Sequence, residues 1–167
     1  MDIEKFRAQI DAVDTEIIRL LNERCRLACE IGAFKNENNL PIYVPERERK
    51  LLERLTSDNP GPLPRESLKA IYREIMSAAI RLERKVTVAY LGPEGTYSQQ
   101  AVLEKFGRSV DFQPQVSIAD VFSAVEAGRA DYGMVPVENT TEGVVNPTLD
   151  TLVESSVKVI AEFNLPI

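Results

Sequence analysis

A proline-free segment at the start of the chain, residues 2 to 38, constrains the fold most. Its apolar residues recur alternately three and four positions apart, with one gap at position 24, and this spacing places side chains on one face of an α-helix. These residues are Ile3, Phe6, Ile10, Val13, Ile17, Leu20, Leu27, Ile31 and Phe34. At about 1.5 Å per residue the helix spans about 55 Å. Because that is too long for a lone small domain, we expect a pair of interlocked helices and therefore a dimer.

Two shorter helices are predicted next. Pro45 suits a first helical position, and the second helix covers about 45–57. The segment 58–62 is rich in proline and glycine and forms a loop, after which Pro64 opens a third helix. The apolar stripe of that helix contains Leu68, Ile71, Tyr72, Ile75, Ala79 and Leu82. The first 85 residues therefore form three helices.

The pattern changes near residue 85. Short β-rich runs at 86–91, 132–137 and 157–163 alternate with helical stretches near 97–106, 118–127 and 147–155, and Ser117 resembles a helix cap. Such alternation predicts a parallel α/β sheet whose functional residues lie at the carboxyl ends of the strands. We therefore divide the chain into two domains, residues 1–85 and residues 86–167.

Charge is distributed unevenly between these parts. Residues 1–85 contain 16 Lys or Arg and 15 Asp or Glu, a net charge of +1, whereas residues 86–167 contain 4 and 11, a net charge of −7. With a pI near 4.9, this balance argues against nucleic-acid binding. The chain has neither a run of about 18 apolar residues nor the basic start and apolar stretch of a secretory signal. We expect a cytoplasmic protein that binds no membrane.

Histidine is absent from the chain, which excludes Ser–His and Cys–His catalysis and histidine-ligated metals. Cys25 and Cys29 have a spacing that suits neither a disulfide framework nor a zinc ribbon. The chemistry must therefore use arginine, lysine, carboxylates, hydroxyls and the backbone.

Charged residues interrupt the apolar faces of the predicted helices. Arg24 fills the gap in the long stripe, and Lys35, eleven residues later, lies only about 20° away around the helix axis. Arg47 and Glu48 each precede a leucine by four positions, so we expect both on the buried face of the second helix. These two cations of the first helix either line a functional pocket or have a purely structural role, in an interhelical salt bridge to Glu48 or Glu83.

Arg7 behaves differently, because it lies about 100° from Arg24 around the helix. It cannot easily line the same pocket from the same helix. Either it is a solvated surface arginine, or it lines the pocket of a neighbouring chain in an antiparallel dimer.

A spaced set of residues runs through the whole first half: Arg7, Asp11, Asp14, Leu20, Leu21, Arg24, Gly32, Lys35, Pro41, Arg47, Glu48, Arg49 and Glu83. This pattern resembles the all-helical chorismate mutase family. The resemblance implies an all-α, three-helix domain in an interlocked homodimer that rearranges chorismate to prephenate. It also implies six catalytic residues, of which Arg7 acts in the partner's site and the rest in their own: Arg7, Arg24, Lys35, Arg47, Glu48 and Glu83.

The roles implied by the resemblance agree with the chemistry. Chorismate is a dianion, and guanidinium groups match carboxylates. By the resemblance, Arg7 and Arg24 bind these carboxylates, Lys35 and Glu83 address the ether oxygen, and Glu48 binds the ring hydroxyl with Arg47 beside it. The Claisen rearrangement is unimolecular and needs positioning and charge stabilisation, without a nucleophile, metal or cofactor.

This chain departs from some members of that family at three positions. It has Val44 where some members carry aspartate, Ala79 where some carry serine and Glu83 where some carry glutamine. The first two changes remove secondary polar contacts. A carboxyl at position 83 can donate a hydrogen bond only when it is protonated, so we expect mutase activity to fall as pH rises.

The second half carries two long motifs, residues 90–98 (YLGPEGTYS) and residues 135–143 (VPVENTTEG). They resemble prephenate dehydratase, which implies a partial α/β lobe of the periplasmic-binding-protein-like type. In the full-length family this domain converts prephenate to phenylpyruvate in phenylalanine biosynthesis. The resemblance suggests four substrate-binding residues: Ser98, Asn139, Thr140 and Thr141. The glycine-rich segment 92–95 either offers backbone N–H groups to an anion or forms a plain tight turn.

The motif Thr-Arg-Phe, which bears the dehydrating threonine in that family, does not occur in the sequence. We therefore expect an incomplete dehydratase domain, without dehydratase activity in this chain. A rival interpretation is a non-catalytic helical dimerisation arm joined to an α/β lobe that senses a small ligand, with the inward charges being structural.

Overall fold

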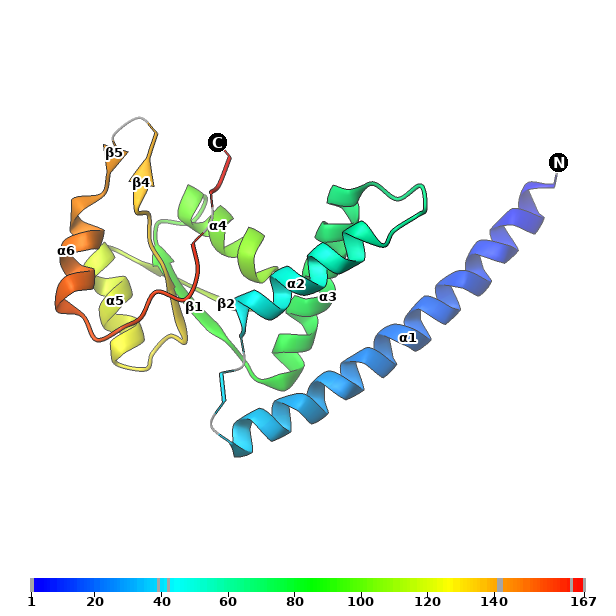
Figure 1. The fold of residues 1–167 in the computed structure, drawn as a ribbon, viewed down its shortest axis with the longest axis horizontal. Coiled ribbons are helices and arrows are strands. Elements are labelled where there is room, and N and C mark those ends of the chain that lie inside the picture. Colours follow the sequence, from blue (N-terminus) through cyan, green and yellow to red (C-terminus); the bar gives the residue numbers. More distant parts are fainter. Residues whose placement is uncertain (1, 39, 42, 141–142, 163, 167) are drawn as a thin grey trace.

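The computed structural model describes residues 2–38, 40–41, 43–140, 143–162 and 164–166. Three helices come first: α1 (Ile3–Glu37), α2 (Pro45–Ser57) and α3 (Arg65–Glu83). Helices α2 and α3 pack side by side, and α1 crosses α3 only near its own carboxyl end, so most of α1 projects away from the rest of the chain (Figure 1). The three predicted helices are confirmed.

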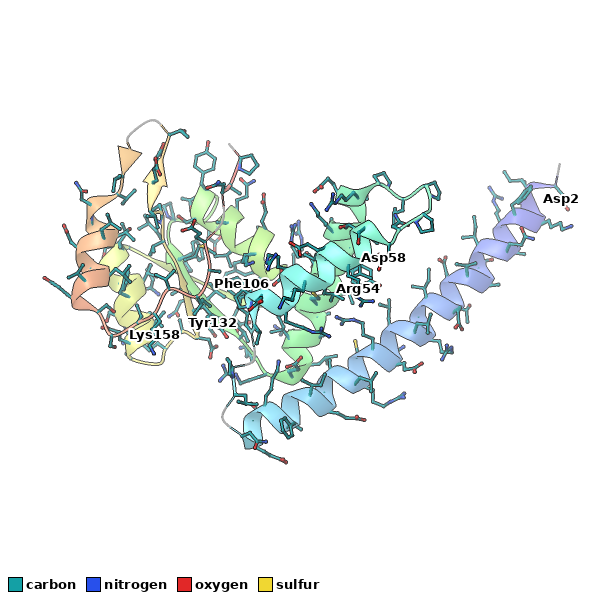
Figure 2. The ribbon with its side chains drawn as sticks, viewed as in Figure 1. Asp2, Arg54, Asp58, Phe106, Tyr132 and Lys158 are labelled. Carbon is teal, nitrogen blue, oxygen red and sulfur yellow. The ribbon has the colours of Figure 1, made fainter. Side chains whose placement is uncertain are left out.

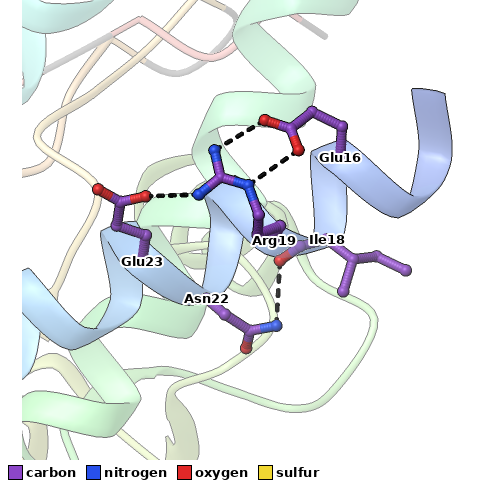
Figure 3. A network of polar contacts seen from close by, with 5 residues as sticks. All are labelled: Glu16, Ile18, Arg19, Asn22 and Glu23. Atoms are coloured by element: carbon purple, nitrogen blue, oxygen red, sulfur yellow. Dashed lines mark hydrogen bonds and ion pairs between the residues drawn. The ribbon is translucent and has the colours of Figure 1, made fainter. Parts of the chain in front are cut away.

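Helix α1 is stabilised locally by its polar face. The Asp2 side chain caps the helix by accepting a hydrogen bond from the Glu4 N–H at 3.1 Å. The guanidinium of Arg19 bridges Glu16 and Glu23, one turn before and one turn after it (Figure 3). This contact lowers the pKa of Glu16 below its usual value.

The apolar face of α1 has no cover within the chain. Each of the nine stripe residues predicted from the sequence is between 47% and 62% exposed. Gly32 is the only buried residue of this helix, all of which is described. A single chain thus leaves the whole stripe open to solvent.

The second half of the chain contains a parallel sheet covered by helices. Strands β1 (Thr87–Leu91), β2 (Asp111–Gln115) and β3 (Tyr132–Met134) are arranged in the order β2-β1-β3, and both pairings are parallel as predicted. The helices are α4 (Tyr97–Phe106), α5 (Ile118–Glu126) and α6 (Asn146–Glu154), and β4 (Glu138–Asn139) and β5 (Gly143–Val144) form an antiparallel pair. The predicted cap is confirmed, because Ser117 accepts a hydrogen bond from the Asp120 N–H.

Two strand predictions need correction, and one strand was missed. Strand β2 was not predicted, because its sequence DFQPQ is mostly polar and contains Pro114, a residue tolerated only at a sheet edge such as this one. Strand β3 ends at Met134 rather than at residue 137. The apolar run at 157–163 forms no strand over its described residues, 157–162, where Val159 and Ile160 are exposed. Residue 163 lies outside the described residues.

The sheet has an apolar core on each face. Successive residues of β1 point to opposite faces, so Val88 and Tyr90 join one cluster and Ala89 joins the other. The first cluster also contains Tyr43, from the connection between α1 and α2. Helix α3 ends at Glu83 and β1 begins at Thr87. The first cluster nevertheless combines side chains from before and after this point, so the two halves of the chain pack together.

Gly107 provides a test of this packing between α3 and the second half. Its φ is +72°, and an added Cβ would lie 2.6 Å from the Cβ of Ser77, whose hydroxyl oxygen accepts a hydrogen bond from the Ser109 N–H. We expect Gly107→Ala to lower the free energy of unfolding by about 1–3 kcal/mol more than Gly128→Ala does, because of the added steric overlap. Gly128 also has a positive φ, but an added Cβ there meets nothing within 4 Å. Urea unfolding measures both losses, and equal losses would contradict the packing argument.

Candidate active site

The crossing of α1 and α3 brings a cation and a carboxylate together. Lys35 Nζ lies 3.4 Å from Glu83 Oε2, and these side chains are only 19% and 9% exposed. Gly32, one turn earlier, allows the approach, since a Cβ there would lie 2.8 Å from both the Cβ and the Cγ of Glu83. The interhelical salt bridge considered from the sequence is therefore present, with Glu83 as the acceptor.

Arg24 lies on the same helix, about three turns before Lys35. The residue is partly buried, and its Nη1 atom is buried with no hydrogen-bond partner among the described residues. Leaving a buried charged donor unpaired is costly, and a carboxylate is the natural acceptor for a guanidinium. This nitrogen does not form the salt bridge considered for Arg24. It can therefore donate a hydrogen bond to an anionic ligand.

The prediction that Arg47 and Glu48 both face inward is wrong for Arg47. Glu48 is partly buried, whereas Arg47 is exposed. Adjacent helical residues point about 100° apart, and the partly buried side of α2 includes Glu48 but not Arg47. Glu48 lies close to the Tyr43 hydroxyl, and burial together with this carboxylate raises the pKa of Tyr43 far above its ordinary range.

Arg7 lies far from these groups. Its side chain is 65% exposed and pairs with Glu4 on its own helix at 2.7 Å. Lys35 lies 28 positions after Arg7, which corresponds to about 42 Å along the helix. Arg7 therefore cannot reach the α1–α3 crossing of its own chain.

The residues suggested for the second half follow two neighbouring strands. Ser98 is partly buried in the first turn of α4, after β1, and Asn139 and Thr140 are exposed on and beside β4, after β3. Thr141 lies outside the described residues. Since β1 and β3 are paired in parallel, their carboxyl ends meet at one edge of the sheet, and both groups follow that edge.

The glycine-rich segment 92–95 uses two of its N–H groups, those of Gly92 and Gly95, within the chain. Gly92 donates to the Gln115 carbonyl oxygen at 2.8 Å, and Gly95 donates to Gln99 Oε1 at 2.6 Å. The Thr96 hydroxyl donates to the Pro93 carbonyl oxygen at 3.0 Å. Of the two interpretations, these bonds favour the tight turn.

Sequence reasoning missed Tyr43 as a neighbour of the site. Its burial depends on Phe106 and Tyr132, far away in the sequence, so no local pattern indicates it. In the part of the chain that the structure describes, no three His, Cys, Asp or Glu residues are placed to hold a metal ion. Within that same part, no helix combines the length and the apolar character needed to cross a membrane.

Comparison with known proteins places each half in a family. Residues 6–84 match the family model for chorismate mutase type II, and residues 88–167 match that for prephenate dehydratase. The bifunctional chorismate mutase/prephenate dehydratase of Aquifex aeolicus is 53% identical over 170 residues, covering 99% of this chain and 47% of that protein. The protein of the same name from Escherichia coli is 32% identical over 179 residues, covering 97% and 46%.

A solved structure of chorismate mutase (form II) from Thermus thermophilus shares 46% sequence identity and covers 48% of this chain and 92% of that chain, with a TM-score of 0.48. The chain spans about half the length of the curated relatives it matches. Its two family matches occur in order and without overlap, and the two bifunctional relatives align with 99% and 97% of it. The chain therefore belongs to the bifunctional chorismate mutase/prephenate dehydratase family, with residues 6–84 in the mutase part and residues 88–167 in the dehydratase part.

Proposed function

We propose that this chain rearranges chorismate to prephenate at the crossing of α1 and α3. One observation carries the proposal. In the segment that matches the mutase family, Arg24 has a buried guanidinium nitrogen without a hydrogen-bond partner among the described residues, and the same helix places Lys35 against Glu83. An arginine nitrogen that has no acceptor among the described residues is suited to an anionic ligand. The substrate of such a mutase carries two carboxylates.

The proposed roles follow from what each group can donate or accept. Arg24 binds one carboxylate and holds the compact conformer of chorismate. Lys35 donates to the ether oxygen as the C–O bond breaks and the new C–C bond forms, and Glu83 borders the same oxygen. Glu48 accepts a hydrogen bond from the ring hydroxyl. All electrons stay within the substrate, so these residues act by positioning and by stabilising charge. Arg47 remains a candidate only through a change of side-chain rotamer, because it is exposed.

We infer that the working form is a homodimer. The exposed apolar stripe of α1 suits burial against a second copy, while the Arg19 network on its polar face remains in water. In such a pair Arg7 of one chain is free to reach the site of the other, which its distance from Lys35 forbids within one chain.

An assay of the intact chain with chorismate, combined with size-exclusion chromatography, tests this proposal. We expect saturable formation of prephenate by a dimer. A folded dimer without turnover would overturn the mutase assignment and favour the rival, a dimerisation arm without catalysis.

Mixing two inactive variants tests the contribution of Arg7 across the dimer. Arg7→Ala chains and Arg24→Ala chains, once exchanged, form heterodimers in which one site has both arginines and the other has neither. We expect activity to recover to about a quarter of the wild-type value, since about half of the dimers are mixed and half of their sites are intact. Mixing differently tagged Arg7→Ala chains is the control. No recovery after proven exchange would show that Arg7 does not act in this way.

For the second half, we propose that residues 86–167 belong to the α/β domain of a prephenate dehydratase, of the periplasmic-binding-protein-like type, and that residues 1–85 form the mutase domain. Support comes from the parallel sheet and from the placement of Ser98, Asn139 and Thr140 after neighbouring strands. Thr141 is part of the same proposed prephenate site. Titration calorimetry with prephenate, in an Arg24→Ala background that weakens the mutase site, should show binding that Asn139→Ala reduces; equal binding by both chains would count against this site.

A further inference from the structure

Tyr43 lies in the short connection between α1 and α2, but its side chain is buried in the second half of the chain. It is 6% exposed and belongs to a core cluster whose other buried members all come from residues 86–110. Figure 1 shows that the chain reaches the sheet and its helices where α2 begins. The start of α2 is thus attached to the region that matches the dehydratase family.

Two aromatic residues hold Tyr43 there. Its ring centroid lies 4.8 Å from that of Phe106 and 5.7 Å from that of Tyr132, and these two rings stack at 5.5 Å. Figure 2 shows Phe106 and Tyr132 beside the start of α2. The ring of Tyr43 is therefore held by residues of the second half.

The hydroxyl of Tyr43 lies near Glu48, one of the residues proposed for the mutase site. Its oxygen is buried and forms no hydrogen bond of standard geometry within the described chain. The nearby acceptor is the Glu48 carboxylate, and burial together with this charge raises the pKa of Tyr43, which keeps the hydroxyl protonated. A small adjustment when the site fills would complete a charge-assisted hydrogen bond from Tyr43 to Glu48.

The start of α2 depends closely on the same connection. Val44, the residue after Tyr43, is the helix cap and provides no side-chain hydrogen bond. Its carbonyl oxygen accepts from the N–H groups of Arg47 at 3.0 Å and Glu48 at 3.3 Å. Whatever fixes Tyr43 therefore also fixes the turn that carries Glu48.

We propose that Tyr43 is a positioning residue for Glu48, and that the α/β half of the chain supports the mutase site through Phe106 and Tyr132. This inference rests on the proposed mutase function. It assigns to the second half a role in the reaction of the first, in addition to any reaction of its own.

The variant Tyr43→Phe removes the hydroxyl and keeps the ring packing. Glu48 is proposed to bind the substrate in both its ground and transition states, so loss of its support should mainly weaken binding. We expect the KM for chorismate to rise about tenfold, with a smaller change in kcat. An unchanged KM in a folded, active protein would overturn the inference.

A double-mutant cycle separates positioning from general stability. If Tyr43 acts through Glu48, the KM of Tyr43→Phe/Glu48→Gln should equal that of Glu48→Gln alone. Effects that multiply independently would show that Tyr43 has only a structural role. A wild-type chain without turnover would instead overturn the proposed function, and this inference with it.

The support from the second half has a separate test. Phe106→Leu removes a ring that contacts Tyr43, and we expect it to raise the KM about threefold. Phe112→Leu is the matched control, because Phe112 packs on the same apolar core from β2 and is not in ring contact with Tyr43 among the described residues. Thermal unfolding shows whether both variants are folded at the assay temperature. Equal KM values for the two variants would show that the support is not specific to Tyr43.

Discussion

Arg24→Ala should abolish most mutase activity without destabilising the chain. Loss of a preorganised donor to substrate charge typically costs about 10²–10³-fold in rate, and we expect a loss of that size in kcat/KM. Stability should stay equal or rise, because the variant removes a buried nitrogen that has no hydrogen-bond partner among the described residues and introduces the best helix-forming residue. A residue kept for function commonly shows this opposition between activity and stability. Chorismate turnover and urea unfolding measure the two effects.

Arg26→Ala is the matched control for this prediction. Arg26 lies two residues further along α1 and is exposed. Its replacement changes the net charge by the same amount as Arg24→Ala but removes no side chain from the proposed site. Circular dichroism and size-exclusion chromatography should show both variants folded and equally associated. If Arg24→Ala retained turnover close to that of Arg26→Ala, the α1–α3 crossing would not be the mutase site.

The helices were predictable because their signals are local. The three- and four-residue spacing, together with Pro45 and the loop after residue 57, determines α1 and α2 without knowledge of any other part of the chain. Strand β2 was missed for the opposite reason. Its polar residues and Pro114 are acceptable only because the strand lies at the sheet edge against β1, a pairing between distant segments.

The site shows the same division. Helical periodicity correctly placed Lys35 near an inner face. Its pairing with Glu83, 48 residues later in the sequence, depends on the crossing of α1 and α3, which no local pattern indicates. The same reasoning failed for Arg47, because a spacing of four residues from a leucine does not show which of two adjacent residues lies on the buried side of α2. Tyr43 gave no local signal at all, since its burial requires aromatic rings from α4 and β3.

Gly32→Ala should open the helix crossing that forms the site. In an unobstructed helix this change stabilises by up to about 1 kcal/mol. Here the new Cβ would lie 2.8 Å from the Glu83 Cβ and 3.1 Å from its Cα, so the backbone of α3 itself must move. Overpacking of this kind costs about 1–3 kcal/mol, which exceeds the gain in helix propensity. The free energy of unfolding should therefore fall.

Activity should fall further than stability in the same variant. Lys35 lies one turn after Gly32, so separating the helices moves its Nζ from Glu83 and from the reacting oxygen together. Misplacement of a catalytic group by about 1 Å can cost about 10²-fold in rate, and we expect kcat to drop at least tenfold. Ala33→Gly, at the adjacent exposed position, is the control: it loses helix propensity by about 1 kcal/mol but leaves the crossing closed, so its kcat should not change. A Gly32→Ala chain that is more stable than the wild type and fully active would show that close approach of α1 and α3 is not needed for catalysis.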